Sequence, residues 1–181
     1  MKNIIKSISV VIPVFNEESN IIELLEELKL KLNNKIKYEV LVVDDGSTDK
    51  TAEIVRKKIK LYHNLKLILH ERNYGQSTSL LTGITNAKHD YIVTIDGDGQ
   101  NDPSDILNLL KKYDSNTPFF LVIGDRKKRN DKFSRIIASR LAFLIRNIIL
   151  KDKVPDTGCA LKVFKKSDFL FVPFFNHIHR F

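Results

Sequence analysis

Hydrophobic residues gather along the chain in five short runs that are rich in β-branched side chains and are separated by more polar stretches. Runs of this length and composition are typical of strands that are buried on both faces of a parallel sheet. We therefore expect strands at residues 8–14, 38–43, 65–69, 91–95 and 119–123.

The stretches between these runs carry apolar residues at helical spacing. We expect helices over residues 17–33, 49–61, 75–88 and 103–113. Because strand and helix alternate strictly, the pattern predicts an α/β fold, with a parallel sheet and helices on both of its faces. After about residue 125 the pattern changes, and we expect a basic loop, an apolar and basic helix over 133–150 and a short strand over 159–164.

Polar residues follow four of the expected strands. Ligands of such sheets bind beyond the carboxyl ends of the strands, so these residues are candidates for a site. The four stretches are PVFNEE, DDGSTD, HERNYGQ and DGDGQ. Any one of them could serve only to end a strand or cap a helix, as Asn, Asp and Gly often do. All four at one edge of the sheet point to a ligand site.

The acidic stretch DGDGQ begins at Asp96 and does not fit a calcium-binding helix-loop-helix. Such a loop needs Gly at its sixth position and Glu at its twelfth, where this chain has Asn101 and Leu107. The chain also lacks the GxGxxG, GxxxxGK[ST] and GxSxG motifs at the places where dinucleotide, phosphate-loop and serine-hydrolase chemistry would require them. Cys159 is interpreted as a small core residue rather than a nucleophile.

An Asp-x-Asp pair at the end of a strand suits Mg²⁺ or Mn²⁺. These cations bind one or two carboxylates together with substrate phosphates. The pair Asp96 and Asp98 therefore predicts a metal that offsets negative charge on a diphosphate leaving group. Asp102 stands directly ahead of Pro103, and this position favours capping of the next helix over metal binding.

Composition narrows the class of protein. With 181 residues, 43% hydrophobic and 29% charged, the chain is expected to form one globular domain. It shows no signal peptide, no apolar run near the ~18 residues of a membrane span, and one cysteine, which excludes an internal disulfide. A reducing, cytoplasmic setting is expected.

The net charge of +8 calls for an anionic partner or a solvated basic surface, and the densest basic cluster is DRKKRNDKFSR at 125–135. Acids at the expected binding edge, and no basic stripe interleaved with aromatic residues, argue against nucleic acid.

Four stretches carry a resemblance to a known family: SVVIPVFNEESNI, VLVVDDGSTDKT, ERNYGQSTSLLTGITNAKHDYIVTIDGDGQNDP and DTGCALKVF. Together they resemble the family 2 glycosyltransferases of the GT-A fold, from about residue 8 to about residue 165. Within that family they are most similar to polyprenyl-phosphate hexosyltransferases of the dolichol-phosphate mannosyltransferase type. The resemblance implies a Rossmann-like, mainly parallel sheet and a metal-dependent, inverting transfer of a hexose from a UDP- or GDP-sugar to a polyprenyl phosphate.

The resemblance also implies roles for individual residues. Contacts to the nucleotide sugar are expected from Pro13, Asn16, Glu17, Asp44, Asp45, Arg72 and Asp96. Either Asp44 or Asp45 is expected to hold the base or the ribose. The metal is expected at Asp96, Asp98 and Gln100, with Asp98 the strongest ligand candidate.

Two arginines in the basic cluster match the acceptor side of the lipid-phosphate enzymes. Arg126 and Arg135 fall where those enzymes clamp the acceptor phosphate, so they join Asp98 as candidate catalytic residues. An ionised phosphate can attack the sugar without a protein base, and the arginines would orient it and offset its repulsion from the diphosphate. The alternative is that the cluster is a solvated loop or docks on anionic headgroups. His179 and Arg180 are further candidates on the acceptor side.

The expected organisation is one glycosyltransferase catalytic domain over 1–181, with 1–125 binding the nucleotide sugar and 126–181 facing the acceptor. Because such enzymes usually continue further, we expect the chain to be truncated at its C-terminus. The helix over 133–150 is either an interfacial membrane helix or a core helix whose arginines reach outward. Membrane contact would place the protein at the inner face of the cytoplasmic membrane.

Three alternatives remain open. A family 2 enzyme could act on a saccharide or another cell-envelope glycan. A sugar-phosphate nucleotidyltransferase should carry a Gly-rich basic loop after its first strand, where this chain has PVFNEE. A non-enzymatic basic module that binds membrane or nucleic acid would explain the charge alone.

Overall fold

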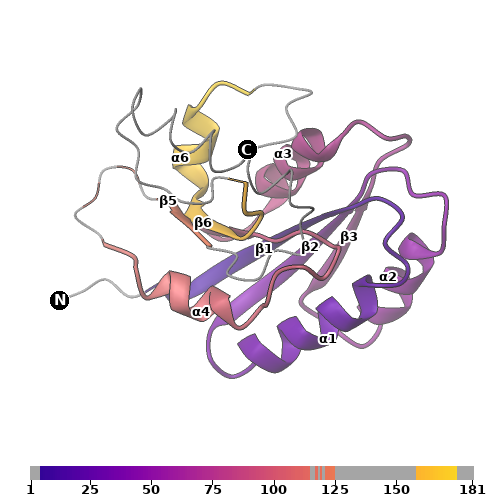
Figure 1. The fold of residues 1–181 in the computed structure, drawn as a ribbon, viewed down its shortest axis with the longest axis horizontal. Coiled ribbons are helices and arrows are strands. Elements are labelled where there is room, and N and C mark those ends of the chain that lie inside the picture. Colours follow the sequence, from indigo (N-terminus) through magenta and orange to yellow (C-terminus); the bar gives the residue numbers. More distant parts are fainter. Residues whose placement is uncertain (1–4, 115–116, 118, 120, 125–157, 175–181) are drawn as a thin grey trace, which may run out of the picture.

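The computed structural model describes residues 5–114, 117, 119, 121–124 and 158–174, and its centre is a six-stranded sheet (Figure 1). The strand order is β3-β2-β1-β4-β6-β5. Neighbours among the first four strands along the chain pair in parallel, whereas β6 is antiparallel to both β4 and β5. The strands are β1 Ser7–Val14, β2 Lys37–Asp44, β3 Leu65–Leu69, β4 Tyr91–Thr94, β5 Leu121–Ile123 and β6 Lys162–Lys165. The predicted mainly parallel sheet is confirmed.

Helices cover both faces of this sheet, which confirms the predicted α/β fold. They are α1 Ile21–Leu32, α2 Thr51–Ile59, α3 Gln76–Asn86, α4 Asp105–Leu110 and α6 Lys166–Phe171. In Figure 1, α1, α2 and α4 lie on one side of the sheet, and α3 and α6 lie on the other. No helix among the described residues is both long and apolar enough to cross a bilayer.

The core is divided by the sheet into two layers. Along β1, Val10 and Ile12 belong to the cluster beneath α1, while Val11 belongs to the cluster beneath α3. Strands whose alternate residues serve opposite layers must be apolar throughout, which explains the continuous hydrophobic runs in the sequence. Each buried Val, Leu or Ile contributes about 1.5–3 kcal/mol to this core.

A buried carboxylate joins three segments in the interior of the fold. Glu39 on β2 is 3% exposed, and its side chain accepts hydrogen bonds from Ser9 Oγ (2.7 Å), Lys88 N (2.6 Å) and Lys66 Nζ (2.9 Å). Burial on its own would raise the pKa of Glu39, but these three hydrogen bonds outweigh it and hold the pKa below its ordinary value. The Glu39 carboxylate therefore keeps its negative charge, because three hydrogen-bond donors surround it.

Several elements differ from the sequence-based expectation at their ends. The expected strand over 119–123 is reduced to β5, the helix over 103–113 to α4, and the strand over 159–164 becomes β6. The helix expected from residue 17 begins at Ile21. Ahead of it, Glu17 N donates to Thr51 Oγ1 at the start of α2, and Glu18 N donates to Asp49 Oδ2 in the loop before α2. The helix expected over 133–150 lies outside the described residues.

Candidate functional site

The carboxyl ends of β1, β2 and β4 meet at a cavity of about 320 Å³. Its walls come from all four of the polar stretches singled out in the sequence. The lining residues are Pro13, Val14, Phe15, Glu17, Asp45, Asn73, Gly75, Gln76, Ser79, Asp96, Gly97 and Asp98. Five of the predicted site residues are thus brought together here: Pro13, Glu17, Asp45, Asp96 and Asp98.

The acidic loop after β4 supplies two carboxylates to this cavity. Asp96 Oδ1 accepts a hydrogen bond of 2.7 Å from Gln76 Nε2, at the first residue of α3. Asp98 Oδ1 accepts from the backbone N–H of Gln100 at 3.0 Å. Gln100 is exposed and does not line the cavity, unlike the two aspartates.

Asp102 was expected to cap the next helix; it bonds to Ser104, which is the N-cap residue of α4. Its Oδ1 accepts a hydrogen bond of 2.7 Å from the N–H of Ser104, and this bond lowers the pKa of the Asp102 carboxyl. The N–H of Asp105 donates to the Asp102 carbonyl at 3.1 Å. Asp102 therefore caps the turn that leads into the helix.

The donor set at the cavity fits a hard divalent cation. Within the described residues, no three His, Cys, Asp or Glu side chains are grouped as a complete metal cage. Asp96 and Asp98 nevertheless line the same wall, and Mg²⁺ and Mn²⁺ commonly take one or two carboxylates and complete their shells with phosphate and water. Two carboxylates suit a metal that is shared with a phosphorylated ligand.

Asn16 lies outside the lining and joins the loop after β1 to the loop after β2. Its Oδ1 accepts from Thr48 N at 2.8 Å, and its own N–H donates to Ser47 Oγ at 3.0 Å. Asn16 has a φ of 57°, in the left-handed region that Asn tolerates better than most residues. Glu17 N, one residue on, donates to Thr51 Oγ1 at 2.9 Å. The contacts of Asn16 thus set the shape of the cavity wall.

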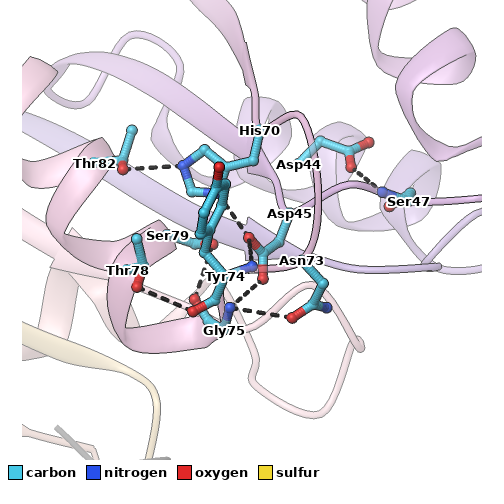
Figure 2. A network of polar contacts seen from close by, with 10 residues as sticks. All are labelled: Asp44, Asp45, Ser47, His70, Asn73, Tyr74, Gly75, Thr78, Ser79 and Thr82. Atoms are coloured by element: carbon cyan, nitrogen blue, oxygen red, sulfur yellow. Dashed lines mark hydrogen bonds and ion pairs between the residues drawn. The ribbon is translucent and has the colours of Figure 1, made fainter. Parts of the chain in front are cut away.

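The two acids at the end of β2, Asp44 and Asp45, point in different directions. Asp44 is 2% exposed, its Oδ1 accepts from Ser47 N at 2.7 Å, and its Oδ2 is buried without a hydrogen-bond partner among the described residues. Asp44 does not line the cavity, whereas Asp45 does. Figure 2 shows the two carboxylates on opposite sides of the strand end. Of this pair, Asp45 is the one that faces the site.

The Asp45 carboxylate is surrounded by hydrogen-bond partners from the segment that follows β3 (Figure 2). Its Oδ1 lies 2.7 Å from His70 Nδ1 and accepts from Tyr74 N at 3.0 Å, and its Oδ2 accepts from Gly75 N at 2.7 Å. His70 Nε2 in turn lies 3.0 Å from Thr82 Oγ1 on α3. Asp45 therefore connects the end of β2 to the loop that opens α3.

One residue that was expected at the site does not line the cavity, and one that was not expected does. Arg72 does not line the cavity, and its guanidinium lies 5.1 Å from the centre of the Tyr74 ring. Phe15, 44% exposed, lines the cavity. Phe15, His70 and Gln76 all belong to the quoted polar stretches, but their roles were not predicted. The fold shows that Phe15 and Gln76 line the cavity and that His70 contacts Asp45.

A second, mostly apolar cavity of about 580 Å³ adjoins the first. Gln76 and Asp96 line both cavities, and Lys162 and Asp168 add charged groups to the second. Its apolar lining includes Leu80, Ile84, Phe119, Leu121, Phe164 and Phe169. Cys159, 1% exposed, is a core residue as expected. The candidate acceptor residues Arg126, Arg135, His179 and Arg180 lie outside the described residues.

Comparison with known proteins gives a family and a fold for this arrangement. Residues 9–171 match the family model described as "Glycosyl transferase family 2". The chain is 35% identical over 177 residues to dodecaprenyl-phosphate galacturonate synthase of Rhizobium johnstonii, covering 96% of this chain and 52% of the relative. It is also 35% identical over 166 residues to undecaprenyl-phosphate 4-deoxy-4-formamido-L-arabinose transferase of Edwardsiella ictaluri, covering 90% and 50%. The chain spans about half the length of the curated relatives it matches.

Solved structures share the fold at lower sequence identity. Glucosyl-3-phosphoglycerate synthase from Mycobacterium tuberculosis, in complex with Mn²⁺, UDP and phosphoglyceric acid, superposes with a TM-score of 0.69 at 20% identity, covering 90% of this chain and 56% of that one. S. aureus TarS 1–349 in complex with UDP gives a TM-score of 0.58 at 22% identity, covering 89% and 47%. Both matches show a common fold.

Proposed function

The chain belongs to glycosyl transferase family 2, and from this premise we propose that it transfers a sugar from a nucleotide-diphosphate sugar to a polyprenyl phosphate. One observation carries the proposal: an acid-lined polar cavity and a mostly apolar cavity meet at Asp96 and Gln76. A charged, water-soluble donor and a lipid acceptor need such a pair of adjoining environments. The relatives at 35% identity are named as polyprenyl-phosphate sugar transferases or synthases, which supports the same acceptor.

The polar cavity is assigned to the donor. Asp96 and Asp98 would hold Mg²⁺ or Mn²⁺, and the bound cation would offset the charge that develops on the departing diphosphate. The M. tuberculosis neighbour that contains UDP and Mn²⁺ supports this choice of ligands. Phe15 offers an exposed ring on which a nucleobase can stack, while Pro13, Glu17 and Asp45 complete the wall.

The apolar cavity is assigned to the first part of the lipid acceptor. Its aliphatic and aromatic lining suits isoprene units, and the ammonium group of Lys162 suits a phosphate. An oxygen of the ionised phosphate would attack the anomeric carbon while the bond from that carbon to the diphosphate breaks. The nucleoside diphosphate leaves, and the anomeric carbon is inverted. Arg126 and Arg135 are proposed to hold the phosphate during this step.

We propose a donor part, 1–125, and an acceptor part, 126–181, but residues of both parts, among them Leu80 and Phe119 of the first, line the apolar cavity. β6 and α6 supply one wall of the apolar cavity, which supports the acceptor side for the second part. A lipid acceptor also supports peripheral contact with the inner face of the cytoplasmic membrane. The named relatives act on galacturonate and on a formamido-arabinose, so the proposed sugar extends from a simple hexose to hexuronates and modified pentoses.

A transfer assay tests the function directly. The purified chain is incubated with Mn²⁺, a panel of radiolabelled UDP- and GDP-sugars and either undecaprenyl phosphate or a free oligosaccharide, and label is measured in the organic and aqueous phases. We expect label in the lipid phase with at least one donor, and loss of that transfer with EDTA. Transfer to the oligosaccharide alone would overturn the acceptor, and no transfer to either acceptor would count against the activity.

A further inference from the structure

We propose that His70 is a positioning residue for the donor site, acting through Asp45 on the loop of residues 71–75. The inference rests on the proposed function, because it assigns the polar cavity to a nucleotide-sugar donor. His70 follows the last residue of β3 and does not itself line either cavity. Its effect must therefore pass through a neighbour that does.

Asp45 is that neighbour, since it lines the donor cavity and contacts the His70 ring at 2.7 Å. The Asp45 side chain is 5% exposed and that of His70 is 10% exposed, so water competes little for their hydrogen bond. The backbone of His70 is fixed as well, because its N–H donates to the carbonyl of Asp44 at 2.9 Å. The imidazole is thus held firmly against one oxygen of the carboxylate.

The partners of the imidazole determine where its protons lie. An ionised carboxylate only accepts hydrogen bonds, so His70 Nδ1 carries a hydrogen and donates it to Asp45. Nε2 faces the hydroxyl of Thr82 at 3.0 Å, which can donate to a neutral ring. Figure 2 shows the ring between these two partners, with Tyr74 beside it at a centroid distance of 5.4 Å. His70 therefore couples Asp45 to the side of α3.

The oriented carboxylate fixes the entry to α3. Asp45 accepts the N–H groups of Tyr74 and Gly75, and Gly75 has a φ of 93°, which side chains of L-residues rarely adopt. The Gly75 carbonyl then accepts from Ser79 N at 3.1 Å in the first turn of α3. Gln76, which follows Gly75 in the chain, donates its side-chain amide to Asp96. A path of direct contacts thus runs from His70 through Asp45 and Gly75 to the acidic loop.

The order Asp45, His70, Thr82 resembles the arrangement in which an acid and a histidine activate a hydroxyl nucleophile. Thr82, however, lines neither cavity, so its hydroxyl does not face the proposed substrates. His70 likewise lines neither cavity, so of the three only Asp45 borders the donor site. Orientation of the loop is the role that these contacts support.

Two substitutions at His70 distinguish the contribution of Nδ1 from that of Nε2. In His70→Asn, the side-chain amide nitrogen occupies a position close to that of Nδ1 and can still donate to Asp45. In His70→Gln, the amide reaches toward the position of Nε2 and Thr82 and leaves Asp45 without its side-chain donor. His63 is exposed, and His63→Gln serves as the control substitution.

Hydrogen exchange by mass spectrometry and calorimetry with UDP or GDP plus Mn²⁺ provide independent measurements. We expect faster exchange at the amides of Tyr74 and Gly75 in His70→Gln, with no change in the core strands, and an affinity for the nucleotide that is about tenfold weaker, the size of one lost hydrogen bond to a charged group. In transfer assays, KM for the donor should rise more than kcat falls. His70→Asn should restore most of both properties, and His63→Gln should match the wild type.

The outcomes distinguish this inference from the proposed function. Wild-type exchange rates at Tyr74 and Gly75 in His70→Gln would overturn the inference, and so would equal losses in the Asn and Gln variants. Faster exchange in a chain that binds neither UDP nor GDP would support the anchoring of the loop by His70 and overturn the assignment of the cavity to a nucleotide donor.

Discussion

The side-chain amide of Gln76 donates a hydrogen bond of 2.7 Å to Asp96 and so ties the start of α3 to the acidic loop after β4. The two residues are separated by 20 positions in the sequence and line both cavities. A carboxylate held in this way has fewer orientations to lose, so Asp96 would be oriented before the proposed metal binds. The acid pair therefore consists of one oriented residue, Asp96, and one attached mainly to its own loop, Asp98.

The first prediction concerns Asp98. Its hydrogen bond to the N–H of Gln100 is local, and the side chain is half-buried, so Asp98→Ala should change the free energy of unfolding by less than about 1 kcal/mol. The same variant should lose Mn²⁺-dependent binding of the nucleotide sugar, since one of two carboxylates is gone. Calorimetry with and without Mn²⁺ measures this loss, and unchanged affinity would reject the metal assignment.

Asp102→Ala is the matched control for that experiment. Asp102 lies four residues further along the same loop but caps the turn before α4. Its removal should lower the free energy of unfolding by about 0.5–2 kcal/mol and leave Mn²⁺-dependent binding unchanged. Asp98→Ala should thus lose binding and keep its stability, whereas Asp102→Ala should lose stability and keep its binding.

Asn16 is predicted to act on stability through the loops it joins. Asn16→Ala removes the acceptor of the Thr48 N–H and also replaces Asn by a residue that tolerates a φ of 57° less well. We expect a loss of about 2–3 kcal/mol in urea unfolding, from the lost hydrogen bonds and the left-handed backbone. Asn16→Gly should lose about 1 kcal/mol less, because glycine adopts this φ readily. Equal losses in both variants would contradict a backbone contribution.

Phe15 is predicted to bind the nucleobase. Stacking of a base on an aromatic side chain contributes about 1–3 kcal/mol, so Phe15→Ala should weaken nucleotide affinity by about 5- to 150-fold. Because the ring is 44% exposed, the fold should tolerate its removal. Phe15→Tyr keeps the ring and should bind as the wild type does. Calorimetry of all three proteins tests the stacking, and full affinity in Phe15→Ala would exclude it.

The Glu39 network predicts a dependence of stability on pH. The pKa of Glu39 is held below its ordinary value in the folded protein, so its contribution is complete above the unfolded pKa and is lost as pH falls through the folded pKa. Glu39→Gln should therefore lower the free energy of unfolding by about 1–3 kcal/mol at pH 7, and the difference should shrink in acid. Urea unfolding at pH 7 and in acid measures both values.

The exposed Glu26→Gln serves as the control for Glu39. Its carboxylate contacts Lys58 and Tyr62 on the surface, where water screens the interaction. It should change stability less than Glu39→Gln at neutral pH. A pH-independent difference between wild type and Glu39→Gln would show that the charge of Glu39 is not what stabilises the network.

Local patterns in the sequence were enough to predict β1 to β4, because each of these strands is apolar over most of its length. The same patterns overextended β5, since Phe119 belongs to the hydrophobic run but is 62% exposed at the apolar cavity rather than paired in the sheet. A hydrophobic side chain tends to leave water, but its identity alone does not fix its place in the fold. Hydrophobicity does not report whether a strand or a cavity accommodates the residue.

The partners of the site residues could not be predicted in this way. Asn16 bonds to residues 31 to 33 positions away, and Asp45 bonds to His70, Tyr74 and Gly75 across 25 to 30 positions. Such pairings depend on how strands align after folding, and no short motif encodes them. The strand-end position predicted that these residues gather at one edge, but not which of them face the ligand and which hold the others in place.

The wall shared by the two cavities would make binding of the proposed donor and binding of the proposed lipid interdependent. The carboxylate of Asp96 and the amide of Gln76 border both cavities, so a ligand that moves either side chain would change the lining of both. By thermodynamic linkage, the factor by which the lipid changes affinity for the donor must equal the factor by which the donor changes affinity for the lipid. Asp96 and Gln76 would then be the residues through which each proposed ligand changes the affinity for the other.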